Sequence, residues 1–292
     1  MEPAEEHDAR SLVLRGGKTV SIENIDMEEL TRFAMDLVQR AGKEALKYYG
    51  RGNPEVKFDE ALVTEAELHL EGFFQQELAA QYPEHEIFGA SPARKDYTHG
   101  EKGYLWVYDA LDGVANFQAG IPIWGTSLAL LENFWPIFGV FFMPSSGDLL
   151  HARAGEKAYW NQNQIRIPES GEISNESVLL TYSRFHQHHR PAHFPGKIRN
   201  LGCTGAHLSY VASGRAEAAL LANISYRDLA ASQIILKAAG GEIRKLDGSK
   251  FYLNEYMEGQ RIEDYLLAVP EGGYSSVAVY LETESSVNEE EK

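Results

Sequence analysis

Two stretches near the start of the chain show the apolar spacing of amphipathic helices. From Asp26 to Tyr49 apolar residues recur every three or four positions, with Asp26 placed to cap the first turn and Gly50 to end the helix. A second apolar stripe follows Thr64, which is placed as its N-cap, and ends at Tyr82–Pro83. The pattern therefore predicts helices over about 26–49 and 64–81.

The pattern then changes to short apolar runs separated by turn residues, which is typical of antiparallel strands. The predicted strands of this part are 86–88, 104–108, 126–132, 135–143, 148–153 and 158–160. After Ile167 strands at 178–182, 197–200, 216–221 and 265–269 alternate with helices at 205–213, 228–239 and 275–281. We therefore predict an α+β protein with layered helices and sheets.

The same changes suggest four parts. Residues 1–25 form an N-terminal extension, which we expect to be a loose arm that could also form a short hairpin around Gly16–Gly17, and 26–167 form an N-terminal α+β half. Residues 168–281 form a C-terminal α/β half, and the glutamate-rich residues 282–292 form a tail that we expect to be disordered.

Charge and cysteine content narrow the classes of function. The net charge of −16 disfavours binding to nucleic acid and to anionic membranes, and Cys203 is the single cysteine, which fits a reducing compartment. We expect this thiol to be a small buried hydrophobe. The first residues have no apolar signal-peptide segment, and no apolar run is long enough to span a membrane. These features together predict a cytoplasmic protein.

The stretch from Trp106 to Phe117 carries the candidate chemistry. An aromatic and β-branched strand ends in Asp109-Ala110-Leu111-Asp112-Gly113, so that two carboxylates leave the sheet three residues apart. They could converge on Mg²⁺, which takes oxygen ligands and keeps positions for water and phosphate. If a helix begins near Ala115 or Asn116, the backbone amides of Gly113, Val114 and Ala115 would face an anion.

This stretch resembles the D-P-I-D-G-T-x-N-F motif of the inositol monophosphatase family of Mg²⁺-dependent, lithium-sensitive phosphatases. The resemblance extends from Ile25 to about Pro270 and includes Trp124-Gly125-Thr126-Ser127, Gly202, Gly214-Arg215, Asp228-Leu229-Ala230-Ala231 and Gly240-Gly241. It implies an αβαβα sandwich of the inositol monophosphatase/fructose-bisphosphatase type. It also implies a homodimer and a small phosphorylated metabolite as the substrate.

A third carboxylate joins the first two in this interpretation. Asp228 opens a predicted helix, where the dipole favours a negative charge, and the family has an aspartate at the matching position. Three clustered carboxylates repel one another, and a divalent cation would relieve that repulsion. We therefore expect Mg²⁺ at Asp109, Asp112 and Asp228, with the Leu111 carbonyl available to a neighbouring ion.

The chain departs from the family pattern at the residues that would activate water. The family has G-E-E where this chain has Gly89-Ala90-Ser91, and a threonine where this chain has Val114. Valine keeps the shape of threonine but offers no hydroxyl. Glu67 replaces a family aspartate and could still act through water.

Two further departures concern the substrate. Leu221 lies where members that cleave inositol phosphates often have glutamate. Arg227 replaces a usual tryptophan, and the simplest role for this arginine is an ion pair with a nearby acid. Neither residue favours inositol as the substrate.

Two functions from different classes are consistent with this sequence. The first is a phosphomonoesterase acting on a small phosphorylated polyol, sugar or nucleotide through Asp109, Asp112 and Asp228, with an altered water site. The second is an inactive family member that binds a metabolite or a protein partner, in which the aspartates persist as turn and packing residues.

Two other groups of residues have simpler interpretations. The segment 184–195, rich in histidine and arginine, could bind a transition metal or grip an anionic substrate, but a solvated surface loop is the interpretation that we favour. The aromatic residues Trp135, Phe138, Phe141 and Phe142 are expected in the sheet core, with any exposed part in a dimer interface.

Overall fold

The computed structural model describes residues 12–13, 19–20, 26–52, 60–88, 103–168, 172–188, 194–256 and 261–281. Its helices are α1 (Met27–Ala45), α2 (Glu60–Gln81), α3 (Val114–Ala119), α4 (Thr204–Ala212), α5 (Tyr226–Ala238), α6 (Tyr274–Ala278) and the 3₁₀ turns η1 (Phe185–Gln187) and η3 (Leu253–Tyr256). Strands β1 (Leu12–Val13) and β2 (Thr19–Val20) pair antiparallel, which confirms the predicted hairpin.

The remaining strands form two sheets. The seven-stranded sheet has the order β3-β4-β5-β6-β7-β8-β9, and its strands are β3 (Glu86–Ile87), β4 (Tyr104–Asp112), β5 (Gly125–Glu132), β6 (Trp135–Met143), β7 (Asp148–Arg153), β8 (Ala158–Trp160) and β9 (Asn163–Ile165). The five-stranded sheet has the order β11-β10-β12-β14-β13, and its strands are β10 (Val178–Thr181), β11 (Lys197–Arg199), β12 (Ala218–Leu221), β13 (Gly241–Lys245) and β14 (Leu266–Pro270).

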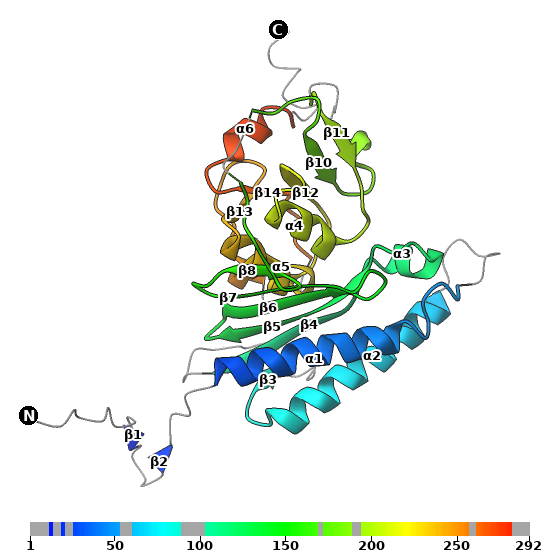
Figure 1. The fold of residues 1–292 in the computed structure, drawn as a ribbon, viewed down its shortest axis with the longest axis vertical. Helices are drawn as coiled ribbons and strands as arrows, with labels where there is room; N and C mark the ends of the chain where they lie inside the picture. The colour runs from blue at the N-terminus through cyan, green and yellow to red at the C-terminus, as the bar shows by residue number, and fades with distance from the viewer. Residues whose placement is uncertain are drawn as a thin grey trace, which may run out of the picture.

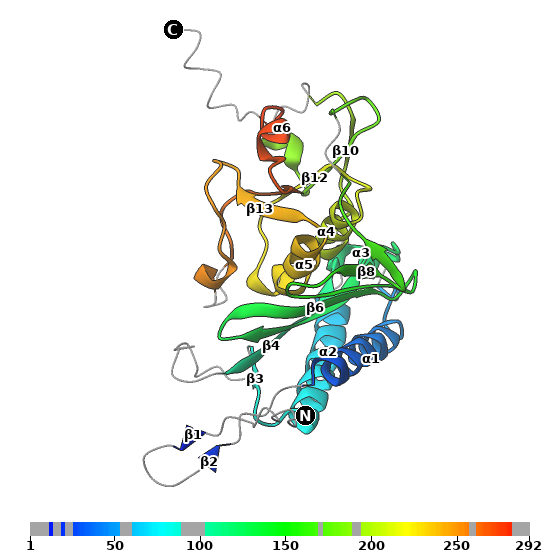
Figure 2. The same ribbon diagram turned by 60° about the vertical axis from the view of Figure 1, so that its left-hand side comes forward.

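The elements stack in five layers (Figure 1). Helices α1 and α2 cover one face of the seven-stranded sheet, and α4 and α5 lie between its other face and the five-stranded sheet, with α6 outermost. The turned view in Figure 2 shows the same succession. The α+β fold predicted from the apolar pattern is thereby confirmed, and the layers alternate as in an αβαβα sandwich.

Each face of the seven-stranded sheet has its own core. Leu30, Leu37 and Phe74 of α1 and α2 pack with Trp106 and Phe138 of the sheet. On the other face α5 approaches β6 so closely that a Cβ at Gly139 would lie 2.5 Å from the Ala231 carbonyl oxygen. The predicted aromatic core of β6 is confirmed for Phe138, Phe141 and Phe142, which are buried. Trp135, at the start of β6, is exposed.

The helix ends test the predictions from capping residues. Asp26 caps α1 through its side-chain oxygen, which accepts the backbone N–H groups of Glu28 and Glu29, so this prediction is confirmed. The predicted start of α2 is wrong, because the helix begins at Glu60 and Thr64 lies within it. The regular helix α1 also ends at Ala45, four residues before Tyr49, and continues as turns.

Two differences among the strands have simple causes. The prediction missed β9 and β13. β9 is mostly polar and largely exposed, and β13 has Ile243 as its one large apolar residue, so both have little apolar pattern. Strand β4 continues through Asp109 to Asp112 instead of breaking at Asp109. Its pairing with β5 shifts register between these two residues, which is where the predicted break lies.

In the five-stranded sheet β10 runs parallel to both β11 and β12, whereas β14 is antiparallel to β12 and β13. The carboxyl ends of β10 and β12 therefore lie at one edge of the sheet, which brings the residues after Thr181 close to those after Leu221. Among the described helices, none has the length and apolar content needed to cross a membrane. The division at Ile167 stays a prediction, and the tail 282–292 lies outside the described residues.

Candidate metal centre

The end of β4 directs two carboxylates toward the helical layer. The register shift between Asp109 and Asp112 is a bulge-type irregularity, which bends a strand and redirects its side chains. The Asp109 carboxylate accepts the Leu111 backbone N–H at 3.1 Å, and the Thr126 hydroxyl donates to the Asp109 carbonyl oxygen at 3.2 Å. These two hydrogen bonds therefore fix the conformation of the bulge.

Asp112 lies against the start of α4. Its Oδ1 accepts the Thr204 backbone N–H at 3.0 Å, and its Oδ2 accepts the Gly205 N–H at 2.5 Å and the Cys203 thiol at 3.2 Å. First-turn amides of a helix lack intrahelical acceptors and favour a negative charge. The carboxylate thus has a fixed orientation although its residue is buried.

Asp228 is the third residue of α5, and it accepts the Ser225 backbone N–H at 2.6 Å as part of a capping box. This confirms the predicted first-turn position. The sequence alone could not show how far Asp228 lies from β4. In the structure, ligand oxygens of Asp109, Asp112 and Asp228 all lie within 4.8 Å of one another.

The electrostatics of this cluster are unfavourable without a cation. Burial raises the pKa of Asp109 well above its usual value, and the nearby charges of Asp228 and Asp112 raise it further. Burial and Asp228 also raise the pKa of Asp112 to about 6, against the lowering effect of the Gly205 and Thr204 amides. A hard divalent cation prefers carboxylate ligands and would remove this repulsion, so the donor set fits Mg²⁺.

The turn after β4 is fixed by glycine and asparagine. Gly113 has a φ of 86°, and a Cβ there would lie 3.0 Å from the Ile123 carbonyl oxygen and 3.1 Å from the Cys203 Cβ. The Asn116 amide donates to the carbonyl oxygens of Ile123 and Leu201 at 2.6 and 2.7 Å. Helix α3 begins at Val114, slightly before the predicted start near Ala115 or Asn116.

The chain matches a known protein family and several known proteins. Residues 26–264 match the model of the inositol monophosphatase family. The chain belongs to this family. A histidinol-phosphatase of Chlorobaculum parvum is 31% identical over 220 residues, which cover 72% of this chain and 83% of that protein.

Two further matches extend this result. The Nus factor SuhB of Xylella fastidiosa is 30% identical over 185 residues, 60% of this chain and 65% of that protein. The IMPase structure of Thermotoga maritima superposes with a TM-score of 0.71 at 24% identity, over 90% of this chain and 99% of that chain, which shows the shared fold.

Val114, which stands where the family has threonine, has an apolar side chain. The Val114 side chain is partly buried and packs against the core between the sheet and helices α1 and α2. No hydroxyl is present at this position of the turn. Ala90 and Ser91, which stand where the family has two glutamates, lie outside the described residues.

Arg227 precedes Asp228 and forms the predicted ion pair. Its Nη1 lies 3.0 Å from Glu71 Oε1 of α2, and its guanidinium lies 5.5 Å from the centroid of the Tyr108 ring. Glu67, one turn before Glu71, is half-buried, and burial together with the Glu71 charge raises its pKa. Glu67 is not in the cluster of three carboxylates, so its catalytic role stays a prediction.

The structure adds partners that sequence reasoning missed. Cys203 is buried as expected, but its thiol also donates to Asp112. Burial and the Asp112 charge raise the pKa of this thiol well above its usual value, which keeps it a neutral donor. The available signal for these donors was the predicted helix start near Gly205, because first-turn amides of a helix have no intrahelical acceptors.

Proposed function

We propose that this family member is a Mg²⁺-dependent phosphomonoesterase that acts on a small phosphorylated polyol, sugar or nucleotide. The proposal rests on one observation above all, namely that Asp109, Asp112 and Asp228 converge within 4.8 Å from two different layers of the fold. We further infer a homodimer in the cytoplasm, from the family resemblance and from the acidic composition with a single cysteine.

In this proposal the three aspartates hold the cation, and the Leu111 carbonyl is available to a second ion. When bound, Mg²⁺ stabilises negative charge on the phosphoryl and leaving oxygens and lowers the pKa of bound water. Asp112 would contribute a fixed orientation, since three donors from 203–205 already hold its oxygens. The amides of Gly113, Val114 and Ala115 would bind phosphate oxygens, and Glu67 would be an additional acid.

A specific observation favours the alternative of an inactive binding or regulatory protein. The Val114 side chain packs on the core and has no proton acceptor, so the turn supplies no hydroxyl to orient water. Loss of one general acid or base typically costs about 10²–10⁴ in rate. One relative is named as a Nus factor and not as a phosphatase.

The test is Mg²⁺-dependent phosphate release from a panel of sugar, polyol, inositol, histidinol and nucleotide monophosphates. Release by the wild type that falls by at least about 10²-fold in Asp109→Asn, and not in the exposed control Asp36→Asn, would support the enzyme. A wild type without release, and release in Ala90→Glu/Val114→Thr, would support the inactive alternative. Direct Mg²⁺ titration calorimetry on the same variants tests the metal site independently of turnover.

A further inference from the structure

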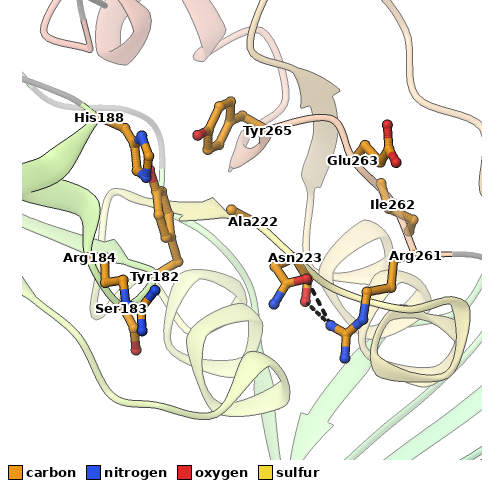
Figure 3. Close-up of a pocket in the computed structure, with 10 residues that line it drawn as sticks. All are labelled: Tyr182, Ser183, Arg184, His188, Ala222, Asn223, Arg261, Ile262, Glu263 and Tyr265. Carbon is orange, nitrogen blue, oxygen red and sulfur yellow. Dashed lines mark hydrogen bonds between the residues drawn. The ribbon is translucent and has the colours of Figure 1, made fainter.

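A pocket of about 670 Å³ opens at the edge of the five-stranded sheet where β10 and β12 end. Figure 3 shows its lining, which comes from the residues after β10, the residues after β12 and the segment leading into β14. The volume lies in the range of pockets that bind small molecules. Arg184 and His188 both line this pocket, although the sequence favours a solvated surface loop for their segment.

Two arginines give the pocket its charge. Within the described part of the chain, neither Arg184 nor Arg261 has an acidic side chain within ion-pair distance. Arg261 uses Nη1 to donate to the backbone and side-chain oxygens of Asn223, both at 2.9 Å, so its Nε and Nη2 remain for a ligand. Glu263 also lines the pocket, but its carboxylate points away from the Arg261 guanidinium (Figure 3).

The backbone at Arg184 suggests that its side chain has a use. Arg184 has a φ of 68°, in the left-handed region, where glycine is far less strained than arginine. Residues held in this region cluster at functional sites. A ligand that binds the guanidinium would explain why arginine occupies the position.

Aromatic rings form another wall. The rings of Tyr182 and Tyr265 lie 5.5 Å apart with an angle of 33°, and His188 stacks on Tyr182 at 6.4 Å. Such flat faces suit the ring or carbon skeleton of a small metabolite. Arginine side chains and ring faces in one pocket suit a compound that combines an anionic group with a carbon skeleton.

Two short connections join the pocket to the three carboxylates. Ser183 of the pocket accepts a hydrogen bond from the Asn200 side-chain amide at 3.0 Å, and four residues later the Thr204 backbone N–H at the start of α4 donates to Asp112. On the other side, Asn223 precedes Asp228 by five residues, a span of at most about 18 Å. The pocket and the carboxylate cluster therefore lie along the same two short segments of the chain.

We propose that the pocket of Arg184 and Arg261 binds a second anionic group of the substrate, a phosphate or a carboxylate, while the carboxylate cluster serves the phosphate ester. This inference rests on the proposed function for the position of the ester. It narrows the substrate class to phosphate esters whose leaving group carries another negative charge.

The experiment compares matched probes by titration calorimetry in Mg²⁺ buffer. Fructose 1,6-bisphosphate is compared with fructose 1-phosphate, and 3-phosphoglycerate with glycerol 3-phosphate, so the two pairs distinguish a phosphate from a carboxylate. The variants are Arg184→Gln, Arg184→Gly and Arg261→Gln. Arg166→Gln, an exposed arginine outside the pocket, is the matched control for net charge. Phosphate release is measured in parallel.

We expect the member with two anionic groups to bind about tenfold or more tightly than its partner in at least one pair, since hydrogen bonds to charged groups are the strong ones. This preference should disappear in the Arg184 and Arg261 variants and remain in Arg166→Gln. Arg184→Gly removes the charge while relieving the backbone, so a loss of binding there is not a folding defect. Equal affinities within both pairs, absence of binding, or a preference that survives in the pocket variants would overturn the proposal.

Calorimetry and turnover separate the two hypotheses. A preference for the probes with two anionic groups, without phosphate release, would leave the pocket supported and the phosphatase refuted. Release from the probes with a single phosphate, without any preference, would support the phosphatase and refute the pocket.

Discussion

Asp109→Asn should stabilise the metal-free protein at pH 8. The substitution removes one of three carboxylates whose oxygens lie within 4.8 Å of one another. At an effective dielectric constant of ~20, two charges at this distance repel by about 3.5 kcal/mol. Asparagine can keep the hydrogen bond from the Leu111 N–H through Oδ1 and donate through Nδ2 to Asp228.

The expected gain is about 3 kcal/mol in the free energy of unfolding, or roughly 5 °C in Tm for a protein of this size. Urea unfolding and calorimetry in EDTA at pH 8 measure it. Asp112→Asn is the matched comparison, because its amide nitrogen would face the N–H groups of Thr204 or Gly205 and leave a buried donor unpaired. That loss costs about 1–3 kcal/mol and offsets the gain.

Mg²⁺ should reverse the order of stabilities. A cation at 1,000 times its Kd stabilises the wild type by about 4.1 kcal/mol, which exceeds the advantage of about 3 kcal/mol expected for metal-free Asp109→Asn, whereas this variant, which lacks one ligand, should gain little from Mg²⁺. A variant less stable than the wild type by more than about 1 kcal/mol in EDTA would refute the electrostatic reasoning. Equal stabilisation of both proteins by Mg²⁺ would refute the assignment of Asp109 as a ligand.

Three further predictions follow from particular contacts. Val114→Thr should cost up to about 3 kcal/mol of stability, because its hydroxyl would lie partly buried against an apolar core. It should also raise Mg²⁺-dependent phosphate release, measured with malachite green on the panel above; unchanged release would show that the hydroxyl is not what limits the rate. The pKa of Asp112 is raised from 3.8 to about 6 in the folded protein, so the folded state binds this proton more tightly than the unfolded state. The free energy of unfolding in EDTA should therefore fall by up to about 3 kcal/mol as the pH rises from 4 to above 6. The Asp112→Asn variant gives the baseline for all other groups, and a flat or rising profile after subtraction of this baseline would contradict the prediction. Gly139→Ala should destabilise the protein by about 1–3 kcal/mol or more, because its Cβ would clash with α5, whereas Gly72→Ala on the open face of α2 should stabilise it by about 0.5–1 kcal/mol; chemical denaturation of both variants checks the contrast.

Much of the fold could be predicted because its signals are local. Apolar periodicity and turn residues give the type of nearly every element between Asp26 and Leu281, and Asp26 caps its helix as its residue type predicts. The local patterns gave wrong predictions where alternative local structures have similar free energies. Thr64 is a good cap by type, but α2 begins at Glu60, and β9 is too polar to carry an apolar pattern.

The candidate aspartates could also be named from the sequence, through their spacing and the family resemblance. Their grouping could not, because Asp228 is more than a hundred residues from Asp112 and reaches it only when α5 packs on the seven-stranded sheet. The raised pKa values depend on that burial and proximity, so they too are tertiary properties.

The sequence by itself thus determined the layered α+β architecture, the three acids, and the loss of a hydroxyl at Val114, because each depends on residue type and local spacing. Only the tertiary structure decided what surrounds them. It brought the thiol of Cys203 and the amides of α4 onto Asp112, and it placed Arg184 and Arg261, which lie far apart in the chain, around one pocket. These contacts depend on how sheets and helices pack across the layers, and the local pattern carries no information about that packing.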